Sequence, residues 1–490
     1  MTTGIKTAKA TNQMIYDVGT RPVAAHAPTS TAATVPDLGD VWAAGRRDGE
    51  SSLPLTMLDE SLLLLQETRA TWNVQFELGA DHYLDEARLR QAVLSCCQRH
   101  PLVRARLTRS PQGETSYRWD FADEVDLDPL RVVECPDSVA LDRLRTELYT
   151  PAIALDTSPG FRVVLAQRPS GDLVLLAASH ILADGVGALR LLQTIARAYQ
   201  GEPDPPDPVP LAQARDLNSF QPPTTRSEKW ARYLEGLRRI REALDPPSRI
   251  AVVGGTDRDD FGFVFRTLDL GETTTPGLMQ RPAGTTVNDV LLAALHVTVG
   301  VWNFKHGAPT GRIGVQMPVN VRPPDRSWDV VSNLTSMVSV STVPDDRVDL
   351  TTAIAAVAEQ TCEIRRNNRA FGLHDVLDVT KKAPLVIKRA VPKLIQLTGD
   401  RFVDTAMLSN LGRIPEPPTL NKRDDSAPPE LWFSPPCDPA CSVAIGVVTV
   451  EQRLTLVTRY RYDQFDADAA EVFTDLLIDQ VTVPGPKRQS

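Results

Sequence analysis

The chain has 490 residues, which is too long for one ordinary hydrophobic core, so two domains or two large lobes are expected. Hydrophobic residues make up 42% and charged residues 23%, a composition typical of a folded globule. The formal charge of −9 argues against a nucleic-acid-binding protein, because duplex binding requires a dense basic surface.

Residues 1–52 lack a continuous apolar stretch and are expected to form a flexible tail that is not a secretory signal. No run reaches the roughly 18 apolar residues that a transmembrane helix needs. The longest apolar run, Val290–Trp302, is short and carries His296, so it is interpreted as a buried helix. Six cysteines in so long a chain suggest a reducing cytoplasm. Separately, we expect the protein to be a monomer.

Residues 53–200 are expected to form an N-terminal lobe of alternating strands and helices. Hydrophobic periodicity and capping signals define its elements. In chain order, they are a strand at Trp72–Leu78, a helix at Asp85–Arg99, a segment His100–Leu107 that breaks at Pro101 and continues as a strand, a helix at Ser138–Tyr149, strands at Phe161–Gln167 and Leu173–Ala178, and a helix at Leu189–Tyr199.

Residues 201–226 are rich in proline and are expected to be a crossover to a C-terminal lobe, residues 227–490. The elements expected there are a helix at Ser227–Asp245, a strand at Phe263–Leu270, a helix at Thr285–Trp302, strands at Arg312–Arg322 and Asn333–Val343, a helix at Leu350–Arg366, strands at Ala406–Gly412, Ser442–Val450 and Arg453–Tyr462, and a helix at Ala467–Gln480. The mixture of both element types in both halves predicts an α/β fold.

The segment ASHILADGVGALRLL, residues 178–192, places His180 at the end of a buried strand and Asp184 at the start of a helix. In a structural interpretation, Asp184 caps the helix and His180 is a hydrogen-bonded histidine at the strand end. In a catalytic interpretation, His180 is a general base, since an imidazole with a pKa near ~6.5 is mostly neutral in the cytoplasm. Gly185 allows a tight turn that leaves the ring facing a channel.

The segment SHILADG resembles the HHxxxDG signature of an acyltransferase superfamily. The superfamily includes chloramphenicol acetyltransferase, the condensation domains of nonribosomal peptide synthetases, bacterial wax ester synthases and polyketide-associated acyltransferases. Other segments are similar to parts of the same family in the same order: LPLTMLDESLLL (53–64), LRQAVLSCCQRHPLVRARL (89–107), TTVNDVLLAAL (285–295), MPVNVRP (317–323) and LSNLGRIP (408–415). The resemblance implies two chloramphenicol-acetyltransferase-like lobes that form a V, with a substrate channel between them.

The resemblance also implies a mechanism in which His180 and Asp184 form the catalytic motif. His180 would take the proton of an acceptor hydroxyl or amine as the acceptor attacks a thioester. Asp184 would point away from His180 and pair with Arg322, while Gly185 shapes the loop. The donor would be acyl-CoA or acyl-phosphopantetheine, used as a co-substrate rather than a permanently bound cofactor. The implied partners are a small-molecule acceptor and, as a candidate, an acyl or peptidyl carrier protein.

Ser179 stands where the signature has its first histidine, although plant acyltransferases of the same fold work with HxxxD alone. The tetrahedral intermediate needs hydrogen-bond donors for its oxyanion. The candidates for such donors or for substrate contacts are Ser179, Asn333, Thr335, Ser336, Ser409 and Asn410. The alternative for each is a polar side chain on a solvated strand face or in a turn.

Two further features of the sequence, a cysteine pair and a basic segment, are weaker indications of a functional site. Cys437 and Cys441 have loose metal-like spacing without further ligands nearby, so no metal site is expected. Residues 381–393 (KKAPLVIKRAVPK) hold five basic residues and no acid. They could attract coenzyme A phosphates, an acidic carrier protein or anionic lipid, but an ordinary solvated helix is the favoured interpretation.

The favoured function is a free-standing acyltransferase of natural-product biosynthesis. One alternative is a lipid O-acyltransferase of the wax ester or glycolipid type. Another is a catalytically silent condensation-like module that binds a carrier protein, an interpretation that Ser179 supports.

Overall fold

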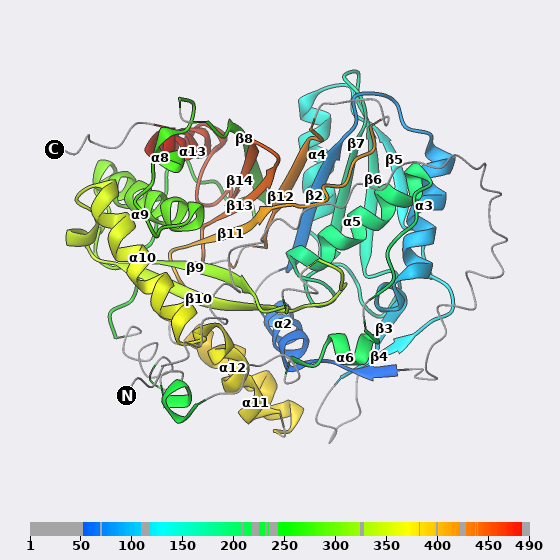
Figure 1. Ribbon diagram of the computed structural model, residues 1–490, viewed down its shortest axis with the longest axis horizontal. Helices are drawn as coiled ribbons and strands as arrows, with labels where there is room; N and C mark the ends of the chain where they lie inside the picture. The colour runs from blue at the N-terminus through cyan, green and yellow to red at the C-terminus, as the bar shows by residue number, and fades with distance from the viewer. Residues whose placement is uncertain are drawn as a thin grey trace, which may run out of the picture.

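The computed structural model describes residues 52–482, apart from gaps at 69–70, 109–116, 208, 218–224, 231–233, 235–243, 272, 324–327, 382, 398–399, 422–427, 437 and 439. Two mixed sheets form its centre, and Figure 1 shows them side by side. The expected α/β character is confirmed. The expected tail up to residue 51 and most of the helix expected at Ser227–Asp245 lie outside the described residues, while Ser52 belongs to a strand.

The five-stranded sheet is built mainly from the N-terminal half of the chain. Its strands, in spatial order, are β12 (Leu431–Ser434), β2 (Asn73–Gly79), β7 (Leu173–Ser179), β6 (Phe161–Gln167) and β5 (Leu130–Glu134). Helices α3 (Glu86–Arg99) and α5 (Gly185–Gln200) pack on one face, and α4 (Ser138–Tyr149) covers the other. Because both faces of β7 are covered, its sequence is an almost unbroken apolar run.

The six-stranded sheet is built from the C-terminal half. Its strands, in spatial order, are β10 (Thr335–Thr342), β9 (Ile313–Asn320), β11 (Ala406–Arg413), β13 (Val443–Val450), β14 (Arg453–Arg461) and β8 (Phe261–Asp269). Helices α9 (Val287–Lys305), α10 (Leu350–Arg366) and α13 (Ala467–Thr482) pack with it in one core. Helix α9 is long and apolar enough to cross a membrane, but 78% of its most apolar window is buried in the fold. This burial on all sides explains why the helix is apolar all round.

Strand β12 joins the two halves of the molecule. It comes from the C-terminal part of the chain, yet it pairs antiparallel with β2 at the edge of the five-stranded sheet. Its other side lies against the six-stranded sheet, where Thr455 Oγ1 donates to the Leu431 carbonyl at 2.8 Å. A Cβ added at Gly446 would lie 2.1 Å from the Phe433 carbonyl oxygen, so only glycine permits this close approach.

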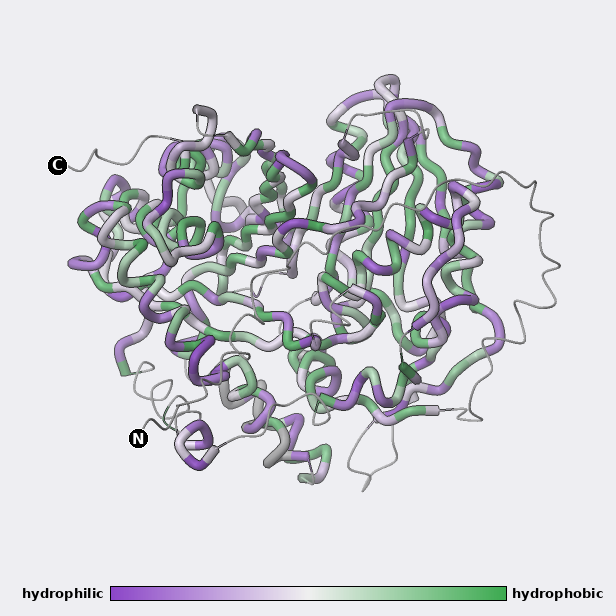
Figure 2. Tube along the Cα trace, in the orientation of Figure 1, coloured by the Kyte–Doolittle hydropathy of each residue, from purple (hydrophilic) through white to green (hydrophobic). Residues whose placement is uncertain are grey.

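The remaining elements lie around the two sheets, most of them in the lower part of Figure 1. They are the small sheet of β1 (Ser52–Pro54), β4 (Arg118–Phe121) and β3 (Ala105–Thr108), the helices α2 (Met57–Thr68), α6 (Leu211–Ala214), α8 (Pro276–Met279), α11 (Gly372–Thr380) and α12 (Leu385–Leu397), and the 3₁₀ turns η1 (Pro101–Arg104), η4 (Pro344–Arg347) and η5 (Arg369–Phe371). At the break expected at Pro101 the chain forms η1, and the strand expected after it begins at Ala105. Figure 2 shows hydrophobic positions concentrated along the strands of the five-stranded sheet, inside the helices that cover them.

Candidate active site

His180 follows the last residue of β7, at the end of the central strand of the five-stranded sheet. Its backbone N–H donates to the Trp72 carbonyl at 2.8 Å, which continues the pairing of β7 with β2. The Trp72 ring meets the imidazole edge to face, with 6.3 Å between centroids, and Asn333 Nδ2 donates to the His180 carbonyl at 3.2 Å. The side chain is only 5% exposed, so the expected ring facing an open channel is corrected to a ring enclosed by its neighbours.

Asp184 is both a helix cap and one half of a buried ion pair. Its Oδ1 accepts from the Gly187 N–H at 2.9 Å, which caps α5. Arg322 Nη1 and Nη2 donate to its two carboxylate oxygens at 2.7 and 2.8 Å. The Leu334 N–H and Thr335 Oγ1 each donate to it at 2.8 Å. The expected Asp184–Arg322 pair is therefore present, and these contacts assign the carboxylate to holding the loop rather than to touching a substrate.

Two glycines at the start of α5 let the other half of the molecule approach the motif. A Cβ added at Gly185 would lie 3.0 Å from Leu411 Cδ2, on β11. A Cβ added at Gly187 would lie 2.8 Å from the Ser332 carbonyl oxygen. Ser332 also accepts from the Asp184 N–H at 3.3 Å, so this approach forms part of the site. Gly187 was not among the residues expected at the site, although it stands two positions after Gly185.

Burial dominates the electrostatics of His180. It lowers the imidazole pKa from its ordinary value, and the Asp184 and Asp59 carboxylates, which act in the opposite direction, do not outweigh it. Burial works to raise the pKa of Asp184, but the Arg322 guanidinium and the hydrogen bonds from Gly187 and Leu334 hold that pKa below its usual value. The site therefore combines a neutral imidazole with an ionised carboxylate.

Helix α2 adds two buried carboxylates to this region. Asp59 pairs with Arg215, which follows α6, and Lys388 Nζ on α12 donates to Glu60 Oε2 at 2.7 Å. Burial raises the pKa of both carboxyl groups, against the effect of their cationic partners. The interpretation of residues 381–393 as a solvated helix is wrong for Lys388, which is 5% exposed and paired across the fold. Asp59, Glu60 and Arg215 were not singled out from the sequence, because no local pattern marks a pair so distant along the chain.

The expected oxyanion donors fall into separate groups. Asn333 and Thr335 already donate hydrogen bonds within the loop, to the His180 carbonyl and to the Asp184 carboxylate respectively. Ser336 lies on β10 with its hydroxyl buried and, within the described residues, without a hydrogen-bond partner. Ser409 and Asn410 lie on β11 and make no hydrogen bond to His180 or Asp184 in the described part of the chain. Asn410 Oδ1 instead accepts from the Gly412 N–H at 2.8 Å.

A row of buried polar side chains near His180 was missed. The strand registers place Asn73 opposite Ser179 and Gln75 opposite Ser434, all on one face of the five-stranded sheet. Among the residues that the structure describes, Asn73 Oδ1, both amide atoms of Gln75, Ser179 Oγ and Ser434 Oγ have no hydrogen-bond partner. The alternation in WNVQFEL was visible in the sequence, but alternation usually indicates a solvated face. Here both faces of β2 are buried.

Metal binding has no support in the described part of the chain, where no group of three or more His, Cys, Asp or Glu is placed to hold an ion. Cys437 lies outside the described residues, and Cys441 is a buried free thiol. Cys96 and Cys97 are also buried and free, packed as small apolar groups, and burial raises the pKa of Cys97 to about 12.

A family model and several individual protein sequences match this chain. A family model for the condensation domain matches residues 54–386. The chain is 34% identical over 415 residues to Rv2305, an uncharacterized protein of Mycobacterium tuberculosis, and this match covers 84% of the chain and 94% of that protein. It is 26% identical over 311 residues to tyrocidine synthase 3 of Brevibacillus parabrevis, a match that covers 60% of the chain but 4% of that protein.

Solved structures share the fold at low sequence identity. The first condensation domain of the calcium-dependent antibiotic synthetase, in complex with a substrate analogue, has a TM-score of 0.63 and 16% identity, over 89% of this chain and 98% of that one. The starter condensation domain of rhizomide synthetase, in complex with C8-CoA and Leu-SNAC, has a TM-score of 0.61 and 12% identity, over 88% and 94%. The epimerization domain from the third module of tyrocidine synthetase B has a TM-score of 0.57 and 16% identity, over 89% and 98%.

Proposed function

Because the chain belongs to the condensation-domain family, we propose that it is an acyltransferase with His180 as its general base. The donor is a thioester on coenzyme A or on a carrier protein's phosphopantetheine, and the acceptor is a hydroxyl or an amine. Natural-product biosynthesis is the setting we favour. The two sheets with their helices are proposed as two lobes in a V, residues 53–200 and 227–490, with the crossover at 201–226 and β12 reaching across the substrate channel.

The observation that best supports this function is the state of the His180 imidazole. Burial lowers its pKa, so the ring is neutral near pH 7 and has a lone pair for a proton. Its Nδ1 has no hydrogen-bond partner among the described residues. The ring position is fixed by β7 on one side and by the Asp184–Arg322 pair on the other. A fixed position and a neutral ring that can accept a proton are both features of a general base.

The proposed reaction is a single acyl transfer. His180 takes the acceptor proton while the acceptor oxygen or nitrogen bonds to the thioester carbon. The carbon–sulfur bond then breaks, and the protonated His180 returns its proton to the leaving thiolate. The products are an ester or amide and a free thiol. Ser179, whose hydroxyl has no partner among the described residues, is the proposed donor to the oxyanion.

The burial of His180 sets a requirement on this proposal. At 5% exposure, the imidazole meets a substrate only if the surrounding walls separate when the ligand enters. The same burial, together with Ser179 in place of the signature's first histidine, favours the second candidate function, a silent module that binds a carrier protein. The lipid O-acyltransferase remains the alternative substrate class for the enzyme.

The test is thiol release from acyl-CoA and from an acyl carrier protein, each with a panel of alcohols and amines. Wild type is compared with His180→Ala and with His306→Ala, a control histidine that is exposed and lies at the end of α9. We expect His180→Ala to lose about 10²–10⁴-fold in rate and His306→Ala to match wild type. Equal, slow thiol release by wild type and His180→Ala, with carrier binding retained, would instead support the silent module.

A further inference from the structure

Helix α12 is held against the fold by one of its faces. Leu385 is buried there, and Lys388 Nζ donates to Glu60 Oε2 on α2 at 2.7 Å. Arg389, next in the chain, donates to the Tyr117 hydroxyl. These contacts fix the orientation of the helix, because they leave its opposite face turned away from the fold.

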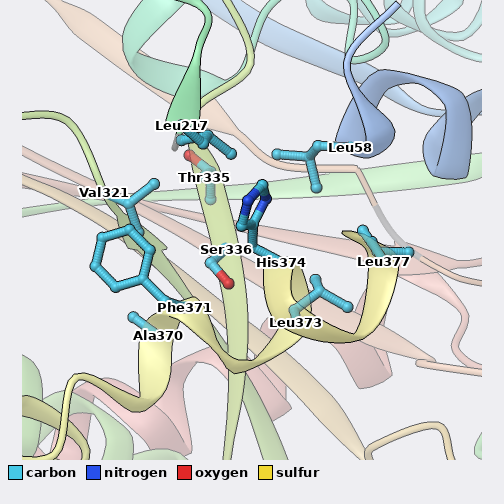
Figure 3. A pocket seen from close by; sticks show the side chains of 10 residues that line it. All are labelled: Leu58, Leu217, Val321, Thr335, Ser336, Ala370, Phe371, Leu373, His374 and Leu377. Atoms are coloured by element: carbon cyan, nitrogen blue, oxygen red, sulfur yellow. The ribbon is translucent and has the colours of Figure 1, made fainter. Parts of the chain in front are cut away.

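Helix α11, which precedes α12, is attached to the same helix of the fold. Figure 3 shows Leu373 and Leu377 of α11 on one side of a narrow hollow and Leu58 of α2 on the other. Both α11 and α12 contact α2, and Figure 1 shows them together at the lower side of the molecule. The face of α12 that is turned away from α2 is therefore presented on a fixed support.

This outer face of α12 carries a row of exposed apolar and basic side chains. Four of its residues are spaced by four, three and four positions, so they lie in one line along the helix: Val386, Ala390, Lys393 and Leu397. All four are exposed, Val386 at 74% and Leu397 at 82%, and Ile387 beside the line is 58% exposed. Single exposed apolar residues are ordinary, but several large ones on one helix face indicate a surface that a partner covers.

The same segment is basic in an acidic protein. Residues 379–399 contain five Lys or Arg and no Asp or Glu, while the whole chain has a formal charge of −9. Besides Lys388, which pairs with Glu60, Lys381 and Lys393 are exposed. Since the chain as a whole is acidic, attraction to an anionic partner must come from this local patch.

An anionic lipid surface fits the outer face of α12 better than a protein does. The helix has 13 residues, too few to span a bilayer, which takes about 20. A short helix with apolar and basic side chains instead lies in the plane of the interface, with its apolar side chains inserted and its lysines reaching toward the headgroups. One face of so short a helix is also smaller than the roughly 800 Å² that a stable protein interface takes from each partner.

We propose that the outer face of α12 docks on an anionic membrane surface. Val386, Ile387 and Leu397 enter the interface, while Lys393 and Lys381, just before the helix, contact lipid phosphates. The binding is peripheral and reversible, since a few side chains and charges make a weak anchor. This inference does not depend on the proposed acyltransferase function, and it applies equally to a silent module.

The test is flotation of the whole 490-residue chain with vesicles. One set is phosphatidylcholine alone, and the other contains about one-third phosphatidylglycerol. Wild type is compared with Leu397→Asp and Lys393→Gln, which change exposed side chains only. The matched controls are Phe304→Asp and Lys305→Gln at the end of α9, where an exposed apolar and an exposed basic residue also occur. Circular dichroism and thermal unfolding check that all variants fold alike.

We expect wild type to bind the anionic vesicles, less so as salt is raised, and to leave the neutral vesicles largely free. Lys393→Gln should weaken binding about fivefold, which is the contribution of one lysine near an anionic surface. Leu397→Asp should weaken it at least about tenfold, because it removes an inserted side chain and adds a repelled charge. Both controls should bind like wild type.

Three results with vesicles would overturn the inference: no binding by wild type, equal binding to neutral and anionic vesicles, or controls that lose as much binding as the α12 variants. Sedimentation velocity examines a second copy as the partner. A wild-type dimer that Leu397→Asp abolishes, without vesicle binding, would assign the face to self-association instead. Binding of an acidic carrier protein that Lys393→Gln weakens, again without vesicle binding, would assign it to a protein partner.

Discussion

Arg322 and Asp184 form a bidentate ion pair that joins the two sheets at the candidate active site. Arg322 lies just beyond β9 of the six-stranded sheet, and Asp184 caps the helix that follows β7 of the five-stranded sheet. The side chains are 0% and 1% exposed, and the two N···O distances are 2.7 and 2.8 Å. The Asp184 carboxylate thus holds the start of α5. Through its bonds to Arg322 and Thr335, it also holds the adjoining ends of β9 and β10.

Breaking this pair should destabilise the fold. Arg322→Ala leaves the Asp184 charge buried without its cation, so the free energy of unfolding should fall by about 3–5 kcal/mol. Asp184→Asn keeps an oxygen for the Gly187 cap and isolates the loss of the ion pair. Urea unfolding should show a similar loss for both variants. A loss below about 1 kcal/mol in Asp184→Asn would show that the cap, and not the pair, is what matters.

Gly187 should not tolerate a side chain. Its added Cβ would lie 2.8 Å from the Ser332 carbonyl oxygen, which is backbone and cannot turn aside. Gly187→Ala should therefore cost about 1–3 kcal/mol and displace the segment that contacts His180. Gly372→Ala is the control, since its Cβ meets no atom within 4 Å and its φ is −60°. Equal thermal stability of the two variants would contradict this account.

The pH dependence of the reaction should follow the His180 imidazole. Because burial lowers its pKa, the neutral form already dominates below the ordinary value of 6.5. We expect kcat/KM to rise with pH through an apparent pKa below 6.5 and to level off at neutral pH. Asp59→Asn removes a carboxylate that raises this pKa, so the midpoint should move to lower pH. A midpoint at or above 6.5 would be inconsistent with the buried base.

The stability of the fold should fall in mild acid because of His296. Burial lowers its pKa from 6.5 to about 3 in the folded state, and Thr342 Oγ1 lies 2.8 Å from Nδ1. Between these values the unfolded chain binds a proton that the folded chain does not. This group alone therefore lowers the free energy of unfolding by about 1.4 kcal/mol per pH unit as pH falls from 6.5.

His296→Asn removes the titration and keeps a polar atom near Thr342. Urea unfolding at several pH values between neutrality and mild acid should give a shallower loss of stability for this variant than for wild type. Parallel curves would mean that other groups control the acid response.

The sequence by itself determined most of the local structure. Strand β7 and helices α3, α5 and α9 were predicted close to their observed limits, because periodicity and capping depend on residues within a few positions of one another. The position of His180 at a strand end and of Asp184 at a helix start followed from the same short-range signals. The pairing of Asp184 with Arg322 came from resemblance, since 137 intervening residues carry no local sign of it.

Only the tertiary structure decided what surrounds these elements. Strand β12 is four residues long, too short for a periodic signal, and it pairs with β2 from the other half of the chain. The alternating polar residues of β2 are of the kind that usually face solvent, yet Gln75 is only 1% exposed. Likewise Lys388 became a buried partner of Glu60, and His180 became enclosed. Burial and long-range pairing depend on the sum of contacts between distant segments, which no window of sequence contains.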